Sequence, residues 1–106
     1  MRTDATGTGI GTDNVEIVIA EILAIADKPP TLIRIGSCGT LREDIALGEL
    51  IVTTGAVRLE STTKYYVEEG YPAVADYAAV AALLEAAHRT GCPAHPGLTA
   101  TAPGFY

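Results

Sequence analysis

The sequence predicts an α/β fold in a single domain. Two stretches have the composition of helices and three have that of strands, and their order (helix, strand, strand, helix, strand) is typical of layered α/β domains. A length of 106 residues suits one domain, and a hydrophobic content of 48% is too high for a disordered chain.

The first helix is expected over residues 15–26, directly after a glycine-rich loop, GTGIGT, at residues 7–12. Asp13 or Asn14 is a suitable N-cap, and the sequence DKPP at residues 27–30 ends the helix. Its apolar residues cover most of the circumference, so we expect the helix to be buried between other layers.

Two strands are expected next. Residues 31–35 form a short β-branched run that ends at Gly36, which is typical of a buried strand, and the small residues 36–40 form a turn. Residues 49–59 (ELIVTTGAVRL), introduced by Gly48, give the clearest strand pattern of the chain.

The second half of the chain continues the pattern. Residues 60–70 are polar and are expected to form an exposed loop. A helix is predicted from Tyr77 to Thr90, because Asp76 is a favourable N-cap and Gly91 a favourable C-terminal stop. Residues 95–102 (HPGLTATA) are predicted to form the last strand.

The charge and the apolar pattern exclude several classes of partner. A net charge of −6 with only 7 Lys and Arg argues against binding to nucleic acid. The longest apolar run, at residues 15–26, contains Glu16 and Glu21 and is too short to span a membrane. With no signal-peptide pattern at the N-terminus and two isolated cysteines, we expect a cytoplasmic protein.

Arg34 is the strongest candidate for a functional side chain. It interrupts an apolar run, where an unpaired guanidinium would be costly to bury, so an anion is expected to face it. Ser37 follows in a turn of small residues with accessible backbone N–H groups. Together they could cradle an oxyanion, although an Arg–Glu pair at the end of the sheet explains Arg34 equally well.

Other candidates are weaker. The glycine-rich loop matches neither a dinucleotide nor a Walker motif, and it fits an anion or sugar site as well as a tight structural turn. Phe105 is either a stacking platform for a planar ligand or a core residue. Cys38 and Cys92 are expected to be small buried hydrophobic residues, and we expect no zinc site.

Five ordered segments resemble the nucleoside phosphorylase-I family, and in particular its uridine-cleaving branch. They are TGIG at 8–11, RIGSCG at 34–39, VTT at 52–54 with VRL at 57–59, YPAVAD at 71–76, and GLTA at 97–100 leading to Phe105 and Tyr106. The resemblance covers nearly the whole chain and keeps the family's order and approximate spacing.

The resemblance implies reversible, phosphate-dependent cleavage of uridine or a related nucleoside, without cofactor or metal. Arg34 and Ser37 match the family's phosphate-binding positions, whereas the nucleoside cavity is lined by the positions that match Ile10, Cys38, Gly39 and Phe105. No residue here matches a catalytic nucleophile. The family also implies a homo-oligomer, a hexamer built from dimers.

The resemblance further implies a three-layer α/β/α phosphorylase/hydrolase-like fold with a mixed central sheet, incomplete in this chain. Residues 1–106 match only the middle of the family domain, because its N-terminal part and its downstream Gln-x-Arg and Glu-Met-Glu elements have no counterpart here. We therefore expect the isolated chain to be inactive. A purine nucleoside phosphorylase or nucleosidase, or a truncated non-catalytic remnant, are the alternatives.

Overall fold

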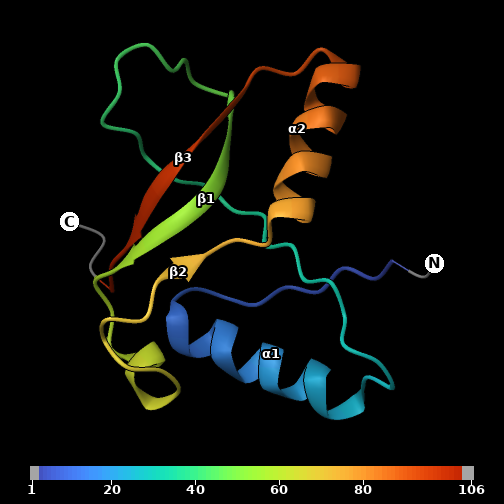
Figure 1. Ribbon diagram of the computed structural model, residues 1–106, viewed down its shortest axis with the longest axis vertical. Coiled ribbons are helices and arrows are strands. Elements are labelled where there is room, and N and C mark those ends of the chain that lie inside the picture. Colours follow the sequence, from blue (N-terminus) through green and yellow to red (C-terminus); the bar gives the residue numbers. More distant parts are fainter. Residues whose placement is uncertain (1–2, 104–106) are drawn as a thin grey trace.

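The computed structural model describes residues 3–103 and shows two helices, a 3-10 helix and three strands (Figure 1). In chain order they are α1 (Thr12–Ile25), β1 (Leu50–Arg58), η1 (Thr62–Tyr65), β2 (Ala73–Val74), α2 (Tyr77–Thr90) and β3 (Ala94–Thr101).

The three strands form one mixed sheet in the order β2-β1-β3. β1 runs parallel to β3, from the Leu50–Ala94 pair to the Arg58–Thr101 pair, and antiparallel to β2. Helix α2 connects β2 with β3 and packs against both β1 and β3 (Figure 1). The predicted α/β class and the mixed sheet are confirmed, as are the strands expected at residues 49–59 and 95–102.

The two ends of α2 lie where the sequence predicts them. The side chain of Asp76 accepts a hydrogen bond from the backbone N–H of Ala79 at 2.9 Å, which satisfies one of the free donors of the first turn. At the other end Gly91 takes a left-handed conformation with φ of 68°, which glycine adopts without steric cost. Both ends of α2 are thus fixed by local chemistry.

A bulge interrupts the pairing of β1 with β3. Thr53 pairs with Gly97 and Gly55 pairs with Leu98, so Thr54 is an extra residue on β1. Gly55 is buried at this point, and a Cβ atom there would lie 3.1 Å from Leu98 Cδ2 and 3.2 Å from a backbone carbonyl oxygen of β2. The close approach of the three strands therefore favours glycine at this position, because a larger residue would push its neighbours apart by a few tenths of an ångström.

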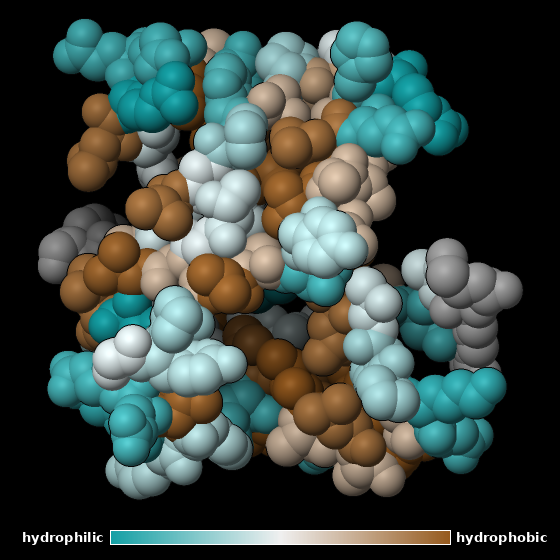
Figure 2. Space-filling model, viewed as in Figure 1, coloured by the Kyte–Doolittle hydropathy of each residue, from teal (hydrophilic) through white to brown (hydrophobic). Residues whose placement is uncertain are grey.

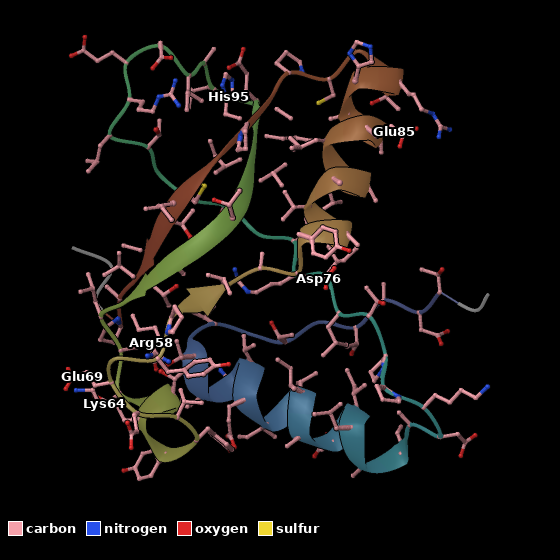
Figure 3. All side chains as sticks on the ribbon, in the orientation of Figure 1. Arg58, Lys64, Glu69, Asp76, Glu85 and His95 are labelled. Carbon is pink, nitrogen blue, oxygen red and sulfur yellow. The ribbon has the colours of Figure 1, made fainter. Side chains whose placement is uncertain are left out.

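The hydrophobic core lies between the sheet and α2. Val52 of β1 and Ala87 of α2 are the buried hydrophobic side chains of the described residues, with 7% and 6% of their surface exposed. At the carboxyl end of β1, the side chain of Arg58 donates to the backbone carbonyls of Glu68, Glu69 and Tyr71, and so ties the loop before β2 to the sheet (Figure 3).

Helix α1 forms as predicted, but its expected burial is wrong. None of its residues is buried, and Ile17 and Leu23 are 52% and 53% exposed. Gly11 occupies the N-cap position and no side chain caps the helix, so the expected cap by Asp13 or Asn14 is wrong as well. The helix lies away from α2 and contacts η1, and hydrophobic residues are visible over it in Figure 2.

The strand expected over residues 31–35 is absent. This segment is irregular and exposed. Leu32 and Ile33 are 46% and 55% exposed. A β-branched run becomes a strand only where another strand can pair with it, and no strand among residues 3–103 pairs with this one.

Residues 60–70 are not wholly an exposed loop. They contain η1, and Glu60 is only 4% exposed, against the prediction. The two-residue strand β2 was not predicted. Among residues 3–103, no helix has the length and apolar character needed to cross a membrane.

Candidate functional site

The guanidinium of Arg34 is open to solvent. The residue is exposed, which corrects the expected burial, and its side chain folds back so that Nη1 lies 3.3 Å from the position a Cβ of Gly36 would occupy. Within residues 3–103 Arg34 forms no ion pair or hydrogen bond, so the alternative of an Arg–Glu pair at the end of the sheet is not observed. Its five N–H donors are free to bind an anion.

Ser37, Cys38 and Gly39 follow Arg34 in the same irregular segment. All three are exposed, and Cys38 carries a free thiol, so the expectation that Cys38 is buried is wrong. Cys92 is half-buried and also free. The segment thus presents a guanidinium, a hydroxyl and a thiol to solvent within five residues of sequence, without a carboxylate among them.

The glycine-rich loop turns sharply just before α1. Gly9 and Gly11 have φ of 74° and 95°, values that favour glycine, and Ile10 between them is 83% exposed. The amide of Asn14 donates to the carbonyl of Ile10, so the loop is held by the first turn of α1. An exposed apolar side chain at a helix N-terminus can contact the apolar face of a ligand whose polar groups face the backbone.

The structure does not join the two sets of predicted site residues. Between the segment at 34–39 and the loop at 7–11, no hydrogen bond or ion pair is formed in the described part of the chain. Phe105, the predicted base-stacking residue, lies outside the described residues. The candidate site residues of the described chain therefore lie on two exposed segments: the phosphate candidates share the segment at 34–39 with Cys38 and Gly39, whereas Ile10 lies in the glycine-rich loop.

A cluster of hydroxyl and carboxyl groups between α1 and η1 was not predicted. Thr62 Oγ1 lies 3.0 Å from Thr12 Oγ1 and donates to the carboxylate of Asp13. The hydroxyl of Tyr66 donates to the carboxylate of Glu16, and this hydrogen bond raises the pKa of Tyr66. Asp13, Glu16, Thr62 and Tyr66 line an open depression of about 440 Å³. The partners are about fifty positions apart in sequence, so no local pattern indicates the cluster.

Glu60 stabilises the start of η1. Its carboxylate accepts hydrogen bonds from the hydroxyl and from the backbone N–H of Thr63, the latter at 3.0 Å. These two bonds lower the pKa of Glu60, the hydroxyl having the larger effect, and burial opposes them. Because Glu60 and Thr63 are only three positions apart, the sequence ESTT at residues 60–63 contains a local signal for this contact, a carboxylate placed to accept a free N–H of a first turn.

His95 and Glu49 pair at the opposite, amino end of β1 and β3. His95 Nε2 lies 2.7 Å from Glu49 Oε2, and both side chains are about three-quarters buried, with 27% and 24% exposed. The hydrogen bond from His95 lowers the pKa of Glu49, with a smaller contribution from the backbone N–H of Ala46. The pair ties the loop before β1 to β3. Among residues 3–103, no three His, Cys, Asp or Glu side chains could together hold a metal ion.

The comparison with known protein families gives one match. Residues 5–106 match the phosphorylase superfamily, a range that includes the glycine-rich loop and the segment around Arg34.

Individual relatives agree with this match. The chain is 46% identical to uridine phosphorylase of Thermococcus kodakarensis over 95% of its length, and 36% identical to uridine phosphorylase of Escherichia coli over 93%. It is 37% identical to guanosine phosphorylase of Halorubrum lacusprofundi over 98% of its length. The chain spans only 36%, 38% and 43% of these three proteins, respectively.

Proposed function

The chain belongs to the phosphorylase superfamily, and from this membership we propose that it is part of a nucleoside phosphorylase. In the proposed reaction an oxygen of inorganic phosphate bonds to C1′ of the nucleoside while the C1′–N bond breaks. The base leaves with the electron pair of that bond and takes up a proton. The products are the free base and ribose 1-phosphate, and the reaction is reversible. The observation that carries the proposal is the match over residues 5–106.

Arg34 and Ser37 are proposed to bind the phosphate. A guanidinium presents two parallel N–H donors to two oxygens of an oxyanion, and a serine hydroxyl adds a third donor. The solvent-open guanidinium of Arg34, which has no carboxylate partner in the described chain, supports this role. Binding would offset the charge of the phosphate and hold it against the sugar.

Ile10, Cys38, Gly39 and Phe105 are proposed to contact the nucleoside. The exposed side chain of Ile10, set between two glycines with positive φ, offers an apolar surface beside accessible backbone groups. The proposed reaction needs no protein nucleophile, because phosphate is itself the attacking group. The protein is proposed to act by positioning the reactants and by stabilising developing charge, with inorganic phosphate as the co-substrate and no cofactor.

Uridine is the substrate we propose first, because relatives named uridine phosphorylase are 46% and 36% identical to the chain. Guanosine is the second candidate, because the guanosine phosphorylase of Halorubrum lacusprofundi matches 98% of the chain at 37% identity. The two substrates differ in the size of the base, so a substrate panel separates them.

The active protein is proposed to be larger than this chain. The chain spans 36–43% of the relatives above, so the other parts of a three-layer α/β/α subunit would supply the rest of the site. We propose that the complete protein is a cytoplasmic homo-oligomer and that the 106 residues alone are inactive; the free thiols of Cys38 and Cys92 fit a reducing compartment. A non-catalytic remnant is the alternative.

The test is an assay of nucleoside cleavage with and without phosphate. It uses this chain and the longest open reading frame that contains it, with uridine, guanosine, inosine and adenosine as substrates. We expect phosphate-dependent release of uracil and ribose 1-phosphate by the longer protein and none by the 106 residues. Cleavage that needs no phosphate would indicate a nucleosidase instead, and cleavage of no nucleoside would indicate a remnant.

A further inference from the structure

Helix α1 is attached to the rest of the described chain mainly through η1 and the residue after it. The helix buries none of its own residues, and its contacts lie with η1. Apart from the bond of Asn14 to the adjoining loop, the side-chain hydrogen bonds that leave it end on Thr62 and Tyr66: Thr12 and Asp13 bond Thr62, and Glu16 bonds Tyr66. A helix without buried residues gains little from packing, so these polar bonds determine where its first turns lie.

The 3-10 helix η1 is itself attached to the sheet by hydrogen bonds. η1 follows β1 by three residues, and the backbone N–H of Leu59 donates to the carbonyl of Thr101 at 2.8 Å, which continues the pairing of β1 with β3. The buried carboxylate of Glu60 then fixes Thr63 in the first turn of η1. The 3-10 helix η1 lies beyond the carboxyl ends of β1 and β3 (Figure 1), and its first residue, Thr62, is held there by these bonds.

The position of Ile10 depends on the same bonds. Gly11 is the N-cap of α1, and Asn14 in its first turn bonds the carbonyl of Ile10. Asp13, the acceptor for Thr62, lies in that same turn. A continuous path of hydrogen bonds and backbone thus runs from the end of β1 through Thr62 and the first turn of α1 to the loop that carries Ile10.

We propose that Thr62 and Tyr66 are positioning residues for nucleoside binding. They hold the first turns of α1, and through them Ile10, at the carboxyl end of β1 and β3, where ligands bind in open α/β sheets. Hydroxyl groups that donate to carboxylates form strong, short bonds, which suits this role. The inference rests on the proposed function, because it concerns the nucleoside side of the proposed site and not the phosphate side.

Two variants remove hydrogen bonds with little change of shape, and two serve as controls. Thr62→Val keeps the shape of the side chain but removes both hydroxyl bonds, and Tyr66→Phe removes one. Thr62→Ser keeps the hydroxyl and should rescue. Tyr65→Phe is the matched control, because Tyr65 is 89% exposed and its hydroxyl forms no hydrogen bond in the described chain.

In the longest open reading frame that contains the chain, Thr62→Val is expected to raise the KM for the nucleoside about ten-fold, as for loss of a bond to a charged group. The KM for phosphate should stay unchanged, as should both constants in Thr62→Ser and Tyr65→Phe. An equal rise in both KM values, or no rise in the nucleoside KM, would overturn the proposal.

A second measurement separates this inference from the proposed function. Hydrogen exchange in the 106-residue chain is expected to speed up in the first two turns of α1 for Thr62→Val and Tyr66→Phe, and to stay unchanged in α2. If the wild type cleaves no nucleoside, the proposed function fails, and exchange alone then decides whether these bonds hold α1. Unchanged exchange in α1 would overturn the inference whatever the activity.

Discussion

Replacing Asp76 with alanine tests how strongly a single side chain stabilises helix α2. The carboxylate of Asp76 accepts the N–H of Ala79 at 2.9 Å, and among residues 3–103 it is the only side-chain cap at that end of the helix. Helix α2 forms the core with the sheet through Ala87, so a frayed first turn weakens the packing that follows it. Asp76→Ala removes this one bond and the negative charge at the helix N-terminus.

The expected cost is about 1 kcal/mol, within the range of about 0.5–2 kcal/mol for loss of an N-cap. Asp76 is exposed, so water partly replaces the lost bond, which keeps the value away from the upper limit. About 1 kcal/mol corresponds to about a five-fold change in the unfolding equilibrium. For a chain of this length it lowers the melting temperature by about 4–8 °C.

The assay is thermal unfolding followed by circular dichroism, together with hydrogen exchange at the N–H of Ala79. Glu85→Ala is the matched control, because it removes a carboxylate from the exposed face of the same helix without removing any hydrogen bond of the described chain (Figure 3). Asp76→Asn keeps the acceptor and should retain most of the stability. If Asp76→Ala melts at the same temperature as Glu85→Ala, the reasoning is refuted.

Three further predictions follow from the site and the sheet. In the complete protein, Arg34→Ala should raise the KM for phosphate at least ten-fold. Arg34→Lys should restore little of the phosphate affinity, because an ammonium lacks the planar fork of a guanidinium. An unchanged KM for phosphate in Arg34→Ala would show that Arg34 does not bind phosphate. Glu49→Gln should destabilise the chain more at neutral pH than in acid. The lowered pKa of Glu49 adds stability above its ordinary value of 4.5, and this stability is lost as the pH falls through the folded value. Urea unfolding at a series of pH values below 7 should therefore show the two proteins converging. Gly55→Ala should destabilise by about 1–3 kcal/mol, because its Cβ would meet a backbone oxygen at 3.2 Å, whereas Gly97→Ala, with open space at its Cβ, should unfold at nearly the wild-type denaturant concentration.

The sequence predicts best the elements whose ends depend on neighbouring residues. Helix α2 begins and ends as predicted because Asp76 and Gly91 act within one turn of their own positions. The long strand β1 is similarly evident from its β-branched run after Gly48. In both cases the relevant chemistry lies within a few residues.

The sequence fails where structure depends on distant partners. The run at residues 31–35 has strand composition but no strand beside it, and α1 has apolar residues but no layer that buries them. The burial expected for Arg34 fails for the same reason. The contacts of Thr62 and Tyr66 with α1 join residues 49 to 50 positions apart, which no local pattern reports.

The extra residue Thr54 changes which side of the sheet the end of β1 faces. In a regular strand, alternate side chains share a face, yet here Val52 and Gly55 are both buried although they are three positions apart. Because of the inserted residue, the face that even-numbered residues of β1 occupy before Thr54 is occupied by odd-numbered residues after it. If Thr54 instead paired with Leu98 in a regular ladder, each later side chain of β1 would change face: Arg58 would turn away from the carbonyls of Glu68 and Glu69 and release the 68–71 turn from the sheet.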